Sequence, residues 1–160
     1  MKKTPTRMMV PGSFALLAGA AANADGVGPA IGPVSWLLAA VLFLWTPPHF
    51  WALAYAKSAD YRNAGIPMLP VVTEPDFWGP VIFGHVLVLV ILSLGPLLHG
   101  LGFLYGACAI LAGGWFLATS FQLMRSPSVP AAWRTFAASL GYFALLSLGV
   151  ILEKLPAWLS

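Results

Sequence analysis

Four continuous apolar stretches, each long enough to cross a lipid bilayer, constrain the fold of this chain more than anything else in it. They cover residues 34–56, 77–98, 101–124 and 135–152, and a shorter stretch rich in alanine and glycine covers residues 8–24. Only 8% of the 160 residues are charged, whereas about a quarter are charged in an average soluble domain. The sequence therefore predicts an all-α integral membrane protein, a single domain formed by a bundle of about five transmembrane helices.

The basic residues indicate how this bundle is oriented. Short loops rich in lysine and arginine stay in the cytoplasm. If the five stretches cross the membrane in alternating directions, Lys154 falls on one side and the other seven basic residues fall on the opposite side: Lys2, Lys3, Arg7, Lys57, Arg62, Arg125 and Arg134. We therefore expect the N-terminus inside and the C-terminus outside. The positive charge is thus concentrated in loops on one side of the bundle, which argues against a nucleic-acid partner.

Tryptophans near the ends of the apolar stretches are expected to anchor the helices at the membrane surface. Indole rings are enriched at this interface because one end of the ring is apolar and the other is polar. The residues in question are Trp36, Trp51, Trp78, Trp133 and Trp158.

The second apolar stretch carries helix-breaking and polar residues at a depth where lipid tolerates few of either. Pro47 and Pro48 each lack an N–H group, so we expect the helix to kink there. His49 follows directly, and on helical spacing it shares a face with Trp45 and Lys57. A histidine at this depth either makes a structural hydrogen bond to a neighbouring helix or serves a functional site, and the residues alone leave both open.

Beyond this stretch, a short loop brings charges of both signs to the membrane surface. Lys57 and Asp60 are three residues apart and would share a face if the helix continued, and Arg62 follows them. Mg²⁺ takes one or two protein carboxylates and leaves its other positions to phosphate and water, while flanking cations can hold diphosphate oxygens. Glu74 and Asp76 can join such a site. The alternative is a solvated loop that only fixes the topology, and charge count alone favours it.

Two sequence blocks in this region resemble the signature of a known enzyme family. The protohaem IX farnesyltransferases, which are UbiA-type membrane prenyltransferases, have a signature similar to W-T-P-P-H-F-W-A-L at 45–53 and D-Y-x-x-A-G-I-P-M-L-P-V-V at 60–72. Weaker similarity at 2–5 and at 134–146 extends the likeness over the whole chain. The chain resembles the C-terminal half of such an enzyme.

The resemblance implies a reaction and its cofactor. Enzymes of this family transfer the farnesyl group of farnesyl diphosphate to a vinyl group of haem B and add water, which forms haem O. The resemblance implies that Asp60 contacts Mg²⁺ or the diphosphate and that Lys57 and Arg62 act as catalytic phosphate clamps. It also implies the cytoplasmic (inner) membrane of a bacterium, with the active face toward the cytoplasm.

The same resemblance suggests which residues contact the substrates. The rings of Trp45, Phe50 and Trp51 are expected to face the prenyl cation or the porphyrin. His49 is expected to contact haem B, either as an axial ligand or through a hydrogen bond to a propionate. Tyr61, in the second block, is a further expected substrate contact.

The chain departs from the family pattern in two places. The family carries an Asn/Asp-rich motif of the N-D-x-x-D kind in its first half, which supplies most of the metal-binding carboxylates, and this sequence contains no such segment. Arg7 and Pro11-Gly12 stand where the family has an asparagine and a glycine pair. We therefore expect this chain to be inactive without the missing N-terminal half, whether the chain is a truncated reading frame, a split half that assembles with an N-terminal partner, or a decayed copy. The alternative is a non-catalytic membrane protein that binds haem or assists oxidase assembly.

Overall fold

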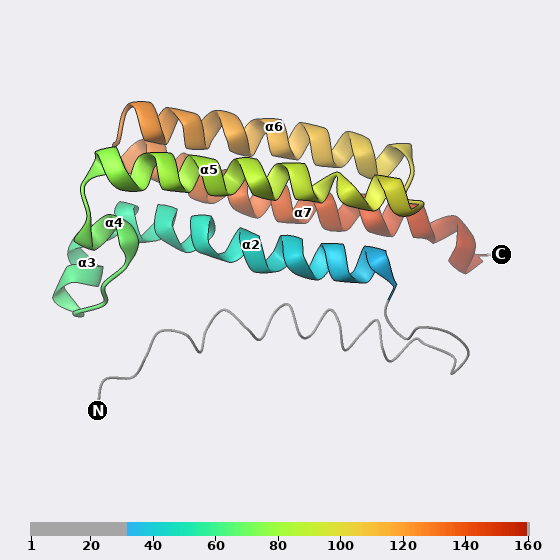
Figure 1. Ribbon diagram of the computed structural model, residues 1–160, viewed down its shortest axis with the longest axis horizontal. Helices are drawn as coiled ribbons and strands as arrows, with labels where there is room; N and C mark the ends of the chain where they lie inside the picture. The colour runs from blue at the N-terminus through green and yellow to red at the C-terminus, as the bar shows by residue number, and fades with distance from the viewer. Residues whose placement is uncertain (1–31, 160) are drawn as a thin grey trace.

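The computed structural model describes residues 32–159, with side chains up to residue 153, as a bundle of long antiparallel helices (Figure 1). The long helices are α2 (Pro33–Ala56), α5 (Pro75–Ser93), α6 (Phe103–Arg125) and α7 (Val129–Leu159). The connections contain α3 (Ser58–Asn63), α4 (Leu69–Val72) and the 3-10 helix η2 (Gly95–His99). No strand occurs within residues 32–159, so the predicted all-α bundle is confirmed. The apolar stretch at 8–24 lies outside the described residues.

Four helical segments in this part of the chain are long and apolar enough to cross a membrane. They are Pro33–Ala56, Pro75–His99, Phe103–Arg125 and Val129–Glu153. The first three agree with the predicted stretches to within two residues at each end. The last begins six residues earlier than predicted, because its start depends on capping and not on hydropathy. Ser128 Oγ accepts a hydrogen bond from the Ala131 N–H group (3.3 Å), and Pro130 suits a first helical turn.

The four long helices form a closed ring in which each packs against the next. α2 packs on α5, α5 on α6 and α6 on α7, and the ring closes where α7 packs on α2. The helices follow one another around the ring in chain order, which is an up-down-up-down arrangement. As a result, α2 and α7 lie side by side although they are far apart in the sequence.

Apolar side chains fill the bundle in two clusters. The larger includes Tyr105 and Phe116 of α6 and Tyr142 of α7, all fully buried. The smaller lies where α5 begins and is centred on Trp78, whose ring centroid is 4.6 Å from that of Tyr55. Only 1% of Trp78 is exposed, so the prediction that it anchors the helix at the membrane surface is wrong. Trp36 and Trp133 do expose their rings, by 57% and 41%.

Two glycines allow the backbones of neighbouring helices to touch. A Cβ atom added to Gly149 of α7 would lie 3.1 Å from the Cα atom of Tyr105 in α6. One added to Gly79 of α5 would lie 3.3 Å from the Cα atom of Met124, also in α6. Small residues at such crossings are the usual means of close packing between membrane helices.

The basic side chains gather at one end of the bundle. Within residues 32–153, every lysine and arginine lies where α2 ends, α5 begins, α6 ends and α7 begins, the end that carries α3 and α4 in Figure 1. Glu153 lies at the opposite end, where its carboxylate accepts a hydrogen bond from the Tyr105 N–H group (3.4 Å). The described basic residues are therefore segregated at one end, whereas Lys2, Lys3 and Arg7 lie outside the described residues.

Candidate functional site

α2 carries the residues of the first sequence block in its second half. The helix is continuous through Pro47 and Pro48, which are both buried. Thr46 Oγ1 donates a hydrogen bond to the Leu42 carbonyl (3.0 Å) one turn earlier. The kink expected at the prolines stays a prediction. Because the helix continues, Trp45 and His49 lie on one face, as their spacing predicts.

The imidazole ring of His49 lies between two other aromatic rings. The Trp45 ring stacks on one side with its centroid 4.3 Å away and an interplanar angle of 21°. The Phe136 ring of α7 stacks at 4.6 Å and 27°. Phe50 approaches the imidazole edge-on at 5.3 Å. These contacts bury the polar imidazole, and His49 is only 8% exposed.

Ser139 of α7 makes two hydrogen bonds with α2. Its backbone carbonyl accepts the Trp45 Nε1–H group at 2.8 Å. Its Oγ atom lies 2.7 Å from His49 Nδ1 and donates to the Phe136 carbonyl at 2.6 Å. We call Trp45, His49, Phe50, Phe136 and Ser139 the histidine cluster. The sequence interpretation missed Ser139, and the available signal was a serine inside an apolar span, where a hydroxyl needs a partner.

Trp51 does not belong to the histidine cluster. Its ring lies edge-on to His85 of α5, with centroids 5.5 Å apart. Trp51 is six positions after Trp45, and this spacing turns it away from the α7 side of the helix. His85 Nε2 is buried and has no hydrogen-bond partner in the described part of the chain. The three expected aromatic contacts are therefore divided between two sides of α2.

The segment that carries Lys57, Asp60 and Arg62, which we call the charged loop, follows the end of α2. The backbone leaves helical geometry at Lys57 (φ −115°, ψ 35°), and α3 then carries the next charged residues, so one helix does not continue through the loop. Lys57 Nζ and Asp60 Oδ2 are 3.9 Å apart, with the two side chains 51% and 72% exposed. Arg62 is exposed and Tyr61 is half-buried on the same short helix. An exposed ion pair of this kind contributes little to stability.

The residues of the charged loop offer one carboxylate to a metal ion. No group of three or more His, Cys, Asp or Glu side chains within the described residues is placed to hold a metal. Glu74 and Asp76 therefore do not complete a protein-only metal site with Asp60. A single carboxylate still fits Mg²⁺ when a diphosphate provides further oxygen ligands, because Mg²⁺ commonly binds proteins in that way.

The histidine cluster and the charged loop lie at different depths. His49 is two helical turns before Lys57, which corresponds to about 12 Å along the helix axis. The cluster is thus inside the apolar part of the bundle, and the loop is at its basic end. A substrate that touches both must have an ionic end and an apolar body.

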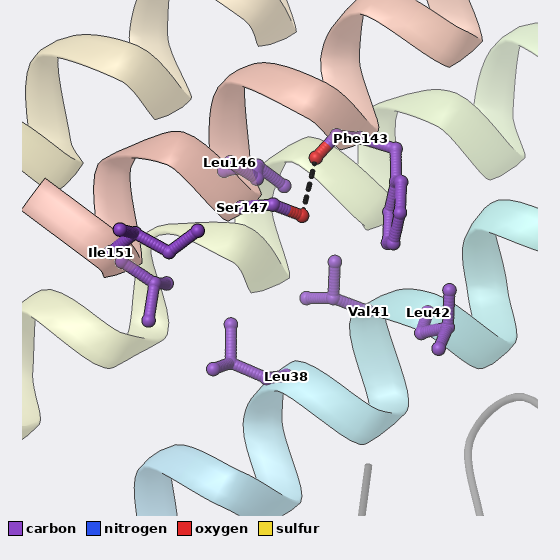
Figure 2. Close-up of a pocket in the computed structure, with 8 residues that line it drawn as sticks. Leu38, Val41, Leu42, Phe143, Leu146, Ser147 and Ile151 are labelled. Atoms are coloured by element: carbon purple, nitrogen blue, oxygen red, sulfur yellow. Dashed lines mark hydrogen bonds between the residues drawn. The ribbon is translucent and has the colours of Figure 1, made fainter. Parts of the chain in front are cut away.

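An apolar groove continues between α2 and α7 on the other side of the histidine cluster (Figure 2). Its volume is about 250 Å³, and its walls include Leu38, Leu42, Phe143 and Ile151. The one hydroxyl in its wall, that of Ser147, already donates to the Phe143 carbonyl (2.9 Å). The Phe143 ring also contacts Trp45 (5.3 Å between centroids), so Phe143 borders both the groove and the histidine cluster.

Comparison with known proteins relates this arrangement to one family. The model of the UbiA prenyltransferase family matches residues 7–151. Protoheme IX farnesyltransferase 2 of Paramagnetospirillum magneticum is 50% identical over 146 residues, which are 91% of this chain and 49% of that protein. Protoheme IX farnesyltransferase of Trichormus variabilis is 42% identical over 125 residues, 76% of this chain and 39% of that protein.

A third relative, protoheme IX farnesyltransferase of Cupriavidus taiwanensis, is 36% identical over 154 residues, 94% of this chain and 49% of that protein. The chain thus spans about half the length of the curated relatives it matches. No solved structure matches it significantly.

Proposed function

This chain belongs to the UbiA prenyltransferase family, and from that premise we propose that it serves the transfer of a farnesyl group from farnesyl diphosphate to a vinyl group of haem B, which forms haem O. One observation carries the proposal: the chain is 50% identical over 146 residues to a relative named protoheme IX farnesyltransferase 2. Helices long and apolar enough to cross a membrane suit a reaction between two amphiphilic substrates.

The charged loop is the proposed site of the diphosphate. Lys57 and Arg62 would bind its oxygens, and Asp60 would hold Mg²⁺ together with it. Mg²⁺ supplies charge neutralisation of the leaving diphosphate when it is bound. The loop suits this role because its side chains are exposed and lightly paired, so they can turn toward an anion without breaking the fold. Tyr61, half-buried on the same helix, is the proposed contact at the boundary with the apolar part.

The histidine cluster is the proposed site for the reacting ends of the substrates. An allylic cation reacts with water unless water is excluded, and the buried rings of Trp45, His49 and Phe50 provide a dry surface. The electron-rich faces of the aromatic rings also stabilise a cation. Trp51, on the α5 side, remains a predicted substrate contact that is separate from this cluster.

We propose that the charged loop faces the cytoplasm, in the inner membrane of a bacterium. The concentration of lysine and arginine at the α3 end supports this orientation, because such residues are retained on the cytoplasmic side. Farnesyl diphosphate would then reach the site from the cytoplasmic surface, with its prenyl chain in the bilayer.

We also propose that turnover requires a separate N-terminal half that carries the N-D-x-x-D motif. Asp60 alone provides one carboxylate to Mg²⁺, and the relatives that match this chain are about twice its length. The two halves would together provide carboxylates from both sides of the diphosphate.

The test is a reconstituted assay. The chain is placed in nanodiscs with haem B, farnesyl diphosphate and Mg²⁺, with and without the N-terminal half of the Paramagnetospirillum magneticum relative. Chromatography should detect haem O only when both halves are present. Haem O from the chain alone would contradict the need for a partner, and no haem O in any combination would contradict the proposed function.

A further inference from the structure

The hydroxyl group of Ser139 determines which nitrogen of His49 carries a proton. A serine hydroxyl has one hydrogen, and Ser139 Oγ donates it to the Phe136 carbonyl at 2.6 Å. The same oxygen lies 2.7 Å from His49 Nδ1 and can therefore only accept a hydrogen bond there. With its hydrogen given to Phe136, Ser139 pairs with the tautomer that carries the proton on Nδ1, and in a neutral imidazole the lone pair is then on Nε2.

The neighbouring rings fix the orientation of the imidazole as well. Trp45 and Phe136 cover its two faces at 4.3 and 4.6 Å, so the ring cannot rotate without displacing one of them. Ser139 occupies the Nδ1 edge and is itself fully buried. The edge that bears Nε2 is the one without a recorded hydrogen bond in the described part of the chain.

We infer that Ser139 is a positioning residue, which holds His49 with the Nε2 lone pair presented as an axial ligand to the iron of haem B. The inference rests on the proposed function, because haem B is the proposed substrate. It decides between the two haem contacts expected from the sequence. A hydrogen bond to a propionate requires an N–H donor, whereas iron requires a lone pair, and the Ser139 hydroxyl leaves His49 with the lone pair.

The surrounding rings suit a porphyrin in this position. The imidazole plane of His49 makes an angle of 21° with the Trp45 ring and 27° with the Phe136 ring. If His49 binds the iron through Nε2, the edges of these two rings would therefore face the porphyrin. Contacts of an aromatic edge with an aromatic face are favourable, because the edge is electropositive and the face electronegative. Ligating histidines are usually oriented by a hydrogen bond on their other nitrogen, which is the role assigned to Ser139.

The experiment is haem B titration of the chain in nanodiscs, followed by resonance Raman spectroscopy of the ferrous form. The wild type should show an iron–histidine stretching band, and His49→Ala should lose it. Ser139→Ala should keep a band at a shifted frequency and bind haem B about tenfold more weakly. Ser139→Thr, which retains a hydroxyl, should restore both the frequency and the affinity.

A matched control separates positioning from packing. Ser120 of α6 is also buried and also donates to the carbonyl three residues before it, but it makes no recorded contact with a histidine. Ser120→Ala should leave the band and the haem affinity unchanged. Size-exclusion chromatography of each variant checks that the fold is retained.

Three results would overturn the inference: an iron–histidine band that survives His49→Ala, a wild-type frequency in Ser139→Ala, or a Ser139→Thr variant as impaired as Ser139→Ala. Its failure is distinct from that of the proposed function. Haem O formation by a wild type that lacks the band would reject the axial ligand and keep the reaction. The band without haem O, even in the presence of an N-terminal half, would reject the reaction and keep the ligand.

Discussion

The charged loop and the histidine cluster are both parts of the candidate site, but the protein holds them by different means. The loop depends on one exposed ion pair, between Lys57 and Asp60 at 3.9 Å. The cluster is fixed by two stacked rings and by hydrogen bonds that join Trp45 and His49 to Ser139. The loop can adjust to a ligand and a partner, whereas the cluster is formed before any ligand arrives. Four substitutions test this contrast.

The largest effect is expected from Asp60→Asn in the two-half enzyme. Loss of the carboxylate removes the one metal contact that the loop offers, so haem O formation should fall about a hundredfold or more. Haem B binding and membrane insertion should be unchanged, because the histidine cluster does not depend on the loop. Asp76→Asn, which changes an exposed carboxylate on α5, is the control. Similar losses in both variants would show that Asp60 has no special role.

Gly149→Val tests the packing that places α7 beside the histidine cluster. The new side chain would meet the backbone of α6 at Tyr105, so the free energy of unfolding should fall by about 1–3 kcal/mol. Reversible unfolding in mixed micelles measures this change. Gly84→Val is the control, because an added Cβ there meets no atom within 4 Å. An unfolding free energy equal to that of the control would contradict the close contact.

Trp45→Phe removes the indole N–H group but keeps an aromatic ring against His49. The Ser139 carbonyl then loses one donor from α2, and the free energy of unfolding should fall by about 0.5–1 kcal/mol. The same unfolding assay applies, with Trp36→Phe at an exposed ring as the control. Equal stability of the two variants would mean that the hydrogen bond between α2 and α7 is not stabilising.

Lys57→Ala should have the smallest effect on stability, below about 0.5 kcal/mol, since both partners of its ion pair are largely exposed. It should still weaken the binding of farnesyl diphosphate by the two-half enzyme, because a cation near the diphosphate is lost. Isothermal titration with farnesyl diphosphate measures the second effect. A large loss of stability with unchanged binding of farnesyl diphosphate would show that Lys57 stabilises the fold and does not bind the ligand.

The sequence predicted the parts of this molecule that depend on local patterns. Long apolar runs located the four described spans, because lipid requires a minimum number of apolar residues in each. Spacing along one helix placed Trp45 and His49 on the same face. Conversely, the start of α7 was missed because capping by Ser128, and not hydropathy, sets it.

The features that depend on the packing of α7 against α2, which closes the ring of four helices, could not be predicted from local patterns. The contact between His49 and Ser139 joins residues 90 positions apart and exists because α7 returns to α2. The burial of Trp78 likewise follows from the packing of α5 within the ring and not from its position near a span end. The family resemblance predicted both Trp45 and Trp51 as substrate contacts. In the fold, Trp45 packs against His49 and Trp51 against His85 of α5.

The hydrogen bond from the Trp45 indole ends on the main-chain oxygen of residue 139 and not on its side chain. A substitution at this position that keeps the helix and its packing therefore keeps the acceptor, and with it the hydrogen bond between α2 and α7. Small side chains of different chemistry at position 139 can thus change what His49 contacts without removing the link between the two helices.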